Sequence, residues 1–296
     1  MKVGILVSGG DAPGMNYVVY EIHEKLKKLG VELLGIKYGY KGLMENDVIA
    51  LDQALLEENK LFSGCILKSS RAPEFKTEKG VKKGLKTIEK NSLDALIILG
   101  GDGSLKGALE LAEKGAKVVF IPATVDNDLK CSSYSLGYYT AVEACRKYIE
   151  LVMRTMETLD RSCLFEVMGN ESGEIAKGVF AASAADYVIN EYNPLNLDKL
   201  VKDIKKNKKP CLKIVVQEKL VNLEELREML TSKTKREFKA CVVGYLQRGE
   251  NPTKEEIKKA KAFSALAVEC IRTHSYNKVI VFNEDSVEAK SMNEIL

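Results

Sequence analysis

The chain has 296 residues, of which 45% are hydrophobic and 29% charged, and its formal net charge is +3. This composition is ordinary for a globular protein of about two domains, and the nearly balanced charge predicts no nucleic-acid partner. No run approaches the roughly 18 apolar residues of a membrane span, and the N-terminus lacks the features of a secretory signal. The seven cysteines are scattered singly, so we expect free thiols in a cytoplasmic protein with no membrane partner.

Short apolar runs alternate with amphipathic stretches along the chain. The expected strands are Val3–Val7, Leu33–Ile36, Ala95–Leu99, Val118–Pro122, Leu164–Val167, Leu212–Val216, Ala240–Leu246 and Val279–Phe282. The helical patterns include Tyr17–Leu29, Val81–Lys90, Thr140–Met156, Leu223–Leu230 and Lys254–Thr273. Most of the strand runs are apolar without alternation, as in parallel sheets covered on both faces. The pattern predicts an α/β fold with two doubly wound, Rossmann-like lobes and mainly parallel sheets.

The lobe boundary is expected near residue 135. Residues 1–135 with about 254–285 should form one lobe and 136–253 the other, while the place of 286–296 is left open. Short loops join the elements, so we expect the lobes to share an interface.

Two glycine-rich turns follow expected strands, and ligands in open α/β sheets bind where strands end. Ser8–Asn16 reads SGGDAPGMN, in which glycines expose backbone N–H groups beside a helix N-terminus and so favour an anion. Gly100–Ser104 reads GGDGS. A carboxylate beside a polyphosphate needs a cation between them, so Asp102 indicates magnesium. GGDG also occurs in NAD kinases and lipid kinases, so it indicates a phosphoryl donor before any acceptor.

A third turn, after Val118–Pro122, places Asp126 and Asp128 two residues apart. Two acids this close repel each other unless a metal or a substrate offsets the charge. One could act as a general base while the other organises a metal. An Asx-rich turn is the structural alternative, which the two preceding loops make less favoured.

These three loops, in this order, resemble the phosphofructokinase family. Further matches are Arg71 with Pro73-Glu74-Phe75, the EVMG run at 166–169, Glu218 at a strand end and GYLQRG at 244–249. The resemblance covers nearly the whole chain. It implies a magnesium-requiring, ATP-dependent kinase of glycolysis that phosphorylates fructose 6-phosphate between two lobes, commonly as a homotetramer, with a homodimer as the alternative. The lobe beginning at residue 1 would bind nucleotide and the other lobe the sugar phosphate.

The resemblance also implies individual roles. Asp126 would be the general base, with Thr124 and Arg71 acting on the transferring group and Asp102 holding Mg²⁺. The implied nucleotide-binding residues are Gly10, Tyr40, Arg71, Ala72, Gly101, Asp102, Gly103, Ser104 and Gly107. The implied acceptor-binding residues are Thr124, Asp126, Asp128, Arg161 from a neighbouring subunit, Met168, Gly169, Asn170, Glu218, Lys239, Tyr245 and Arg248.

The sequence indicates the phosphoryl donor more clearly than it indicates the acceptor. Pyrophosphate-using relatives carry Asp and Lys where this chain has the small residues Gly103 and Ala123, so we expect ATP. Asn170, Lys239 and Tyr245 replace cations or a forked guanidinium, which weakens the expected phosphate clamp. Tagatose 6-phosphate or sedoheptulose 7-phosphate therefore stays open as acceptor. A catalytically silent regulatory paralogue is the alternative from another class.

Overall fold

The computed structural model describes residues 1–283 and 286–295, so the expected lobe end at residue 285 lies outside the described chain. The chain divides into two compact units. The first unit contains Met1–Thr124, Leu129–Tyr139 and Arg248–Leu296, and the second contains Val125–Asp128 and Thr140–Gln247. Among the described residues, no helix is both long and apolar enough to cross a membrane.

The described part of the first unit is built on one seven-stranded sheet, in the order β11-β10-β5-β4-β1-β2-β3. Its strands are β1 (Lys2–Val7), β2 (Glu32–Ile36), β3 (Val48–Ala50), β4 (Ala95–Gly100), β5 (Val118–Pro122), β10 (Lys278–Asn283) and β11 (Ser286–Ser291). The five inner strands are parallel, and β3 and β11 pair antiparallel at the edges. β4 and β5 are buried along their whole length, which explains their unbroken apolar sequence.

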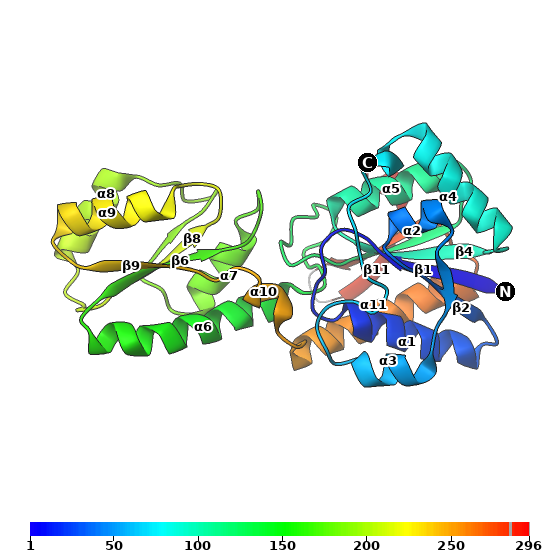
Figure 1. The fold of residues 1–296 in the computed structure, drawn as a ribbon, viewed down its shortest axis with the longest axis horizontal. Helices are drawn as coiled ribbons and strands as arrows, with labels where there is room; N and C mark the ends of the chain where they lie inside the picture. The colour runs from blue at the N-terminus through cyan, green and yellow to red at the C-terminus, as the bar shows by residue number, and fades with distance from the viewer. Residues whose placement is uncertain (284–285, 296) are drawn as a thin grey trace. The chain divides into compact units, whose positions relative to one another are not determined.

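Helices cover both faces of this sheet. They are α1 (Met15–Lys28), α2 (Tyr40–Glu45), α3 (Gln53–Asn59), α4 (Glu78–Lys90), α5 (Asp102–Glu113) and α11 (Lys254–Arg272), with the 3₁₀ turns η1 (Pro73–Lys76) and η2 (Met292–Glu294). Figure 1 shows α1, α3 and α11 on one face and α2, α4 and α5 on the other. The β1 and β4 strands therefore each lead into a helix from the same edge of the sheet, where phosphate-binding turns are expected.

The second unit repeats this layering on a smaller scale. Its described strands form a four-stranded parallel sheet, β7-β8-β6-β9, comprising β6 (Ser162–Val167), β7 (Tyr187–Ile189), β8 (Lys213–Gln217) and β9 (Phe238–Val242). Its helices are α7 (Glu174–Ala182), α8 (Leu197–Lys206), α9 (Leu223–Thr234) and most of α6 (Tyr138–Thr158). The short helix α10 (Leu246–Gly249) has residues in both units. Figure 1 shows α6 and α7 on one face of this sheet and α8 and α9 on the other.

The predicted α/β class, with two doubly wound lobes of mainly parallel strands, is confirmed. One strand prediction is wrong in its second half, because the run Ala240–Leu246 leaves the sheet after Val242. Gly244 has a φ of 57°, a left-handed conformation that ends an extended strand, and α10 starts at Leu246. The strands β3, β7 and β11 were not expected, since two are only three residues long and the third is largely polar.

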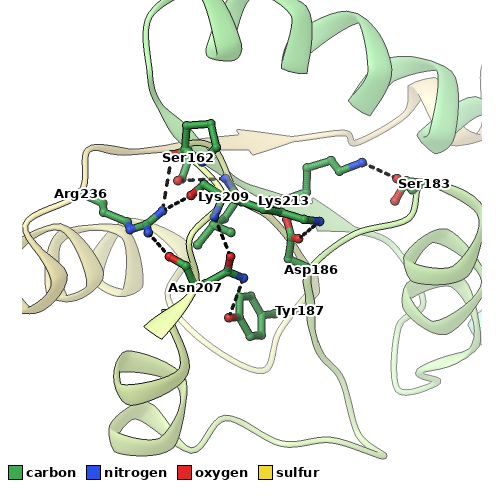
Figure 2. A network of polar contacts seen from close by, with 10 residues as sticks. Ser162, Ser183, Asp186, Tyr187, Asn207, Lys209, Lys213 and Arg236 are labelled. Carbon is green, nitrogen blue, oxygen red and sulfur yellow. Dashed lines mark hydrogen bonds and ion pairs between the residues drawn. The ribbon is translucent and has the colours of Figure 1, made fainter. Parts of the chain in front are cut away.

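A polar network closes the turn between α8 and β8 (Figure 2). Lys209 Nζ lies 2.6 Å from Asp186 Oδ1, and Asp186 Oδ2 accepts from the Lys213 backbone N–H at 2.9 Å. The Arg236 guanidinium donates to the backbone carbonyl oxygens of Lys209, at 2.6 Å, and of Asn207. Lys209 and Arg236 therefore stabilise the turn after α8 against the edge of the sheet.

Candidate active site

The turns after β1 and β4 lie against each other in the first unit. Ser104 Oγ donates to the Ser8 carbonyl oxygen at 3.1 Å, and the Ser8 N–H donates to the Leu99 carbonyl oxygen at 2.9 Å. Parallel pairing of β1 with β4 brings both carboxyl ends to the same edge. The two turns that the sequence predicts to bind phosphate therefore lie side by side at one edge of the sheet.

The first of these turns depends on glycine. Gly9 and Gly14 have φ angles of 90° and 93°, in the left-handed region that side chains disfavour. Gly14 is the N-cap of α1 and no described side chain caps this helix. Because the first N–H groups of a helix need partners from outside it, this turn offers donors to an anionic ligand.

Asp102 is the first residue of α5, and its half-exposed carboxylate pairs with Lys106 Nζ at 2.6 Å. The described chain has no cluster of three or more His, Cys, Asp or Glu that could hold a metal by itself. Magnesium usually binds through one or two carboxylates together with substrate phosphates and water. The exposed Asp102 carboxylate, beside a turn that offers backbone N–H donors, fits this mode of binding if the ion replaces the Lys106 ammonium as its partner.

Tyr40 stabilises the turn after β4. Its hydroxyl donates to the Ser104 carbonyl oxygen at 2.6 Å, and its ring stacks on the Phe75 ring with the two centroids 4.1 Å apart. A Cβ added at Gly107 would lie 2.8 Å from the same ring, so glycine is required there. Burial raises the pKa of Tyr40 well above its ordinary value, so the hydroxyl stays a donor. Arg71, just before η1, is exposed.

The third loop begins beside the β4 turn. The Ala123 N–H donates to the Gly100 carbonyl oxygen at 2.9 Å, and Ser135 Oγ donates to the Thr124 carbonyl oxygen at 2.7 Å. A Cβ added at Gly101 would lie 3.4 Å from Thr124 Cβ. Thr124 is therefore fixed next to the glycine-rich turn within the first unit.

Asp126 and Asp128 group with the second unit. Both side chains are half-buried, and Asn127 between them has a φ of 50°. Asparagine tolerates this left-handed conformation better than most residues do. The turn therefore presents two carboxylates that are neither fully solvated nor fully buried.

In the second unit, the structure brings Met168, Asn170 and Glu218 together at the carboxyl ends of β6 and β8. The Asn170 N–H donates to Glu218 Oε1 at 2.9 Å, and the Met168 N–H donates to Gln247 Oε1 at 3.1 Å. Gln247 is fully buried. Gln247 belongs to the GYLQRG run, and its role in positioning Met168 depends on β9 pairing with β6, which the sequence pattern does not reveal.

Arg161 and Lys239 lie at the other end of the same sheet. Both pair with Glu237, at 2.9 and 3.0 Å, and together they hold the pKa of that carboxyl below its ordinary value. Arg161 precedes β6, whereas Met168 follows it. Because a strand rises about 3.3 Å per residue, roughly 20 Å separates them. These two predicted phosphate ligands are not brought to Met168 and Glu218 within one chain.

The remaining acceptor-side residues divide between the units. Tyr245, in the second unit, is 82% exposed. Arg248, in the first, donates from Nη1 to the Asp11 carbonyl oxygen at 2.8 Å and lies against Gly10. Arg248 thus lies at the turn after β1, where it adds positive charge.

The parallel sheets, with glycine-rich turns at adjoining strand ends, define an α/β protein suited to phosphorylated ligands. The family model described as phosphofructokinase matches residues 2–271. The ATP-dependent 6-phosphofructokinase of Finegoldia magna is 33% identical over 99% of this chain and 92% of its own. The chain belongs to the phosphofructokinase family.

Solved structures show the same fold. Pichia pastoris phosphofructokinase in the T-state superposes with a TM-score of 0.91 at 21% identity, covering 99% of this chain and 37% of that one. A pyrophosphate-dependent phosphofructokinase from Nitrosospira multiformis gives 0.90 at 16% identity, covering 99% and 84%. A relative named for pyrophosphate and a relative named for ATP both match this chain. The fold alone therefore does not identify the phosphoryl donor.

Proposed function

We propose that this protein transfers the γ-phosphoryl group of ATP to the 1-hydroxyl of fructose 6-phosphate, giving fructose 1,6-bisphosphate and ADP, as a glycolytic enzyme of the cytoplasm. The observation that carries the proposal is family membership over residues 2–271. The paired turns after β1 and β4, joined through Ser104 and Ser8, support it because they expose backbone donors as a polyphosphate requires.

Phosphoryl transfer asks the protein mainly for positioning and charge neutralisation. Asp126 would accept the proton of the attacking hydroxyl, while Arg71 and Thr124 would hold the transferring group. Asp102, supported by Asp128, would hold Mg²⁺ on the nucleotide phosphates, and the ion would neutralise part of their charge. Because Asp126 is half-buried, part of its side chain stays accessible.

Two small residues favour ATP as the donor. A Cβ added at Gly103 would meet no heavy atom within 4 Å, so the first turn of α5 leaves room beside Asp102. Ala123 is buried against the end of β4, through its N–H bond to the Gly100 carbonyl oxygen. Neither position places a charged side chain in the space that the inner phosphates of a nucleotide need.

The acceptor site is proposed to need a second copy of the chain. Arg161 and Lys239 lie at the opposite end of the second unit's sheet from Met168 and Glu218, so they would serve the acceptor of a neighbouring subunit. This supports a homo-oligomer, a homotetramer or a homodimer. Asn170 and the exposed Tyr245 leave the acceptor pocket unusual, which keeps other ketose phosphates as the second candidate.

The test is ATP consumption with Mg²⁺ and a panel of fructose 6-phosphate, tagatose 6-phosphate and sedoheptulose 7-phosphate. We expect the highest kcat/KM with fructose 6-phosphate, and we expect Asp126→Ala to lower kcat by about 100- to 10,000-fold, as loss of a general base does. Asp94→Ala, at an acid remote from the three loops, is the matched control and should retain activity. Turnover of no sugar phosphate by the wild type would favour the silent paralogue.

A further inference from the structure

Lys219, at the carboxyl end of β8, is held in an unusual conformation. Its φ of 68° is left-handed, which is uncommon for residues with a side chain. Its ammonium donates to Asn170 Oδ1, and Asn170 is itself left-handed with a φ of 53°. The Asn170 N–H in turn donates to Glu218 Oε1 at 2.9 Å. Backbone and side chain therefore both direct Lys219 to the turn that follows β6.

Buried groups hold this arrangement from beneath. Gln217 is 1% exposed, and its Nε2 lies 3.4 Å from the Asn170 carbonyl oxygen while its Oε1 accepts from the Glu191 N–H at 3.0 Å. The Glu218 N–H donates to the Val167 carbonyl oxygen at 2.9 Å. The ends of β6 and β8 are thus tied together, which fixes the turn at Asn170 that the Lys219 ammonium contacts.

Two acidic residues, Glu166 and Glu218, lie at the same ends of β6 and β8. Glu166 is half-buried at the end of β6, and its pKa is raised first by burial and then by the negative charge of Glu218. A phosphorylated sugar carries up to two negative charges, so these carboxylates would repel it without a nearby cation. Lys219 is exposed, and Asn170 takes one of its three N–H donors within the described chain. Two donors remain for a ligand.

We propose that Lys219 is an acceptor-binding residue, whose ammonium, stationed by Asn170, binds the anionic phosphorylated ketose at the carboxyl ends of β6 and β8. This rests on the proposed function and adds a residue to its acceptor site. Asn170 itself carries only a neutral amide, so Lys219 is the cation that this pair of residues offers to a ligand.

The test is calorimetric binding of fructose 6-phosphate, tagatose 6-phosphate and sedoheptulose 7-phosphate to the full chain without nucleotide, followed by steady-state kinetics. Lys219→Met should weaken binding of the preferred ketose phosphate about tenfold and raise its KM to match, with kcat and the KM for ATP within about threefold of wild type. Lys219→Arg should stay within about threefold for all of them, because the charge is kept. Asn170→Gly keeps the left-handed backbone and removes the amide, so it should have an intermediate effect.

Lys233→Met, at an exposed lysine on α9, removes the same charge elsewhere in the unit and is the matched control. Equal binding by Lys219→Met and Lys233→Met would overturn the role of Lys219 while leaving the proposed function intact. A loss of kcat without a change in binding or KM would also overturn it. If the wild type bound none of the sugar phosphates, both the proposed function and this inference would fall together.

Discussion

At the scale of single residues, the space around the turns after β1 and β4 depends on where a Cβ atom would fit. A Cβ at Gly10 would collide with the Arg248 guanidinium, and one at Gly107 would press into the Tyr40 ring. A Cβ at Gly103 would meet no heavy atom of the described residues within 4 Å. A side chain at Gly10 would therefore displace the end of Arg248, one at Gly107 would disturb the packing of Tyr40, and one at Gly103 would disturb neither.

Gly103 should consequently set the donor. Gly103→Asp adds a carboxylate in the first turn of α5, where the helix N-terminus tolerates negative charge and the fold should survive. A second acid beside Asp102 would repel the inner phosphates of ATP, so kcat/KM for ATP should fall about 100-fold. Gly103→Ala, which adds a Cβ without charge, should stay within about threefold. Full ATP activity in Gly103→Asp would show that this position does not select the donor.

At the scale of elements, the ends of β6 and β8 place Glu166 near Glu218. Burial and the neighbouring charge raise the pKa of Glu166, so the folded chain holds this proton to higher pH than the unfolded chain does. Stability therefore falls as pH rises from the ordinary glutamate pKa through the raised value. Glu166→Gln should remove this loss, giving a higher Tm than wild type at neutral pH and a flatter dependence across the same window. Thermal melts without ligand from pH 4 to 8 check it, and an unchanged profile would contradict it.

How much of each element the sequence predicts depends on the physical cause of that element. The long parallel strands are buried on both faces, so β4 and β5 stand out as continuous apolar runs. β11 is polar and exists because it pairs with β10, a partner that no local pattern reveals. Likewise, the contact between Lys219 and Asn170 depends on β8 lying beside β6. Glycine-rich turns at strand ends can be predicted from the sequence, whereas contacts between loops depend on the strand order.

At the scale of the whole molecule, the two ends of β6 carry different parts of the proposed acceptor site. Met168 and Asn170 follow the strand, while Arg161 precedes it and pairs with Glu237. An oligomer resolves this separation if each acceptor pocket combines the carboxyl end of one sheet with the amino end of another. Arg161 and Asp126 would then act in the same pocket from different subunits. A substitution at each can therefore be placed in a different subunit of one oligomer.

Mixing two inactive variants should therefore restore activity. Arg161→Ser should raise the KM for the acceptor well over tenfold, because it removes a forked cation from the phosphate, and Asp126→Ala should be inactive. In a hybrid pair, the pocket that combines an intact Asp126 with an intact Arg161 is complete. If pairs re-form at random after dissociation of an equal mixture, about one quarter of wild-type activity should return. Recovery is measured at an acceptor concentration where Arg161→Ser alone is silent, with unmixed variants carried through the same dissociation as controls. If no activity returns although hybrids are detected by native mass spectrometry, Arg161 acts in its own subunit or not at all.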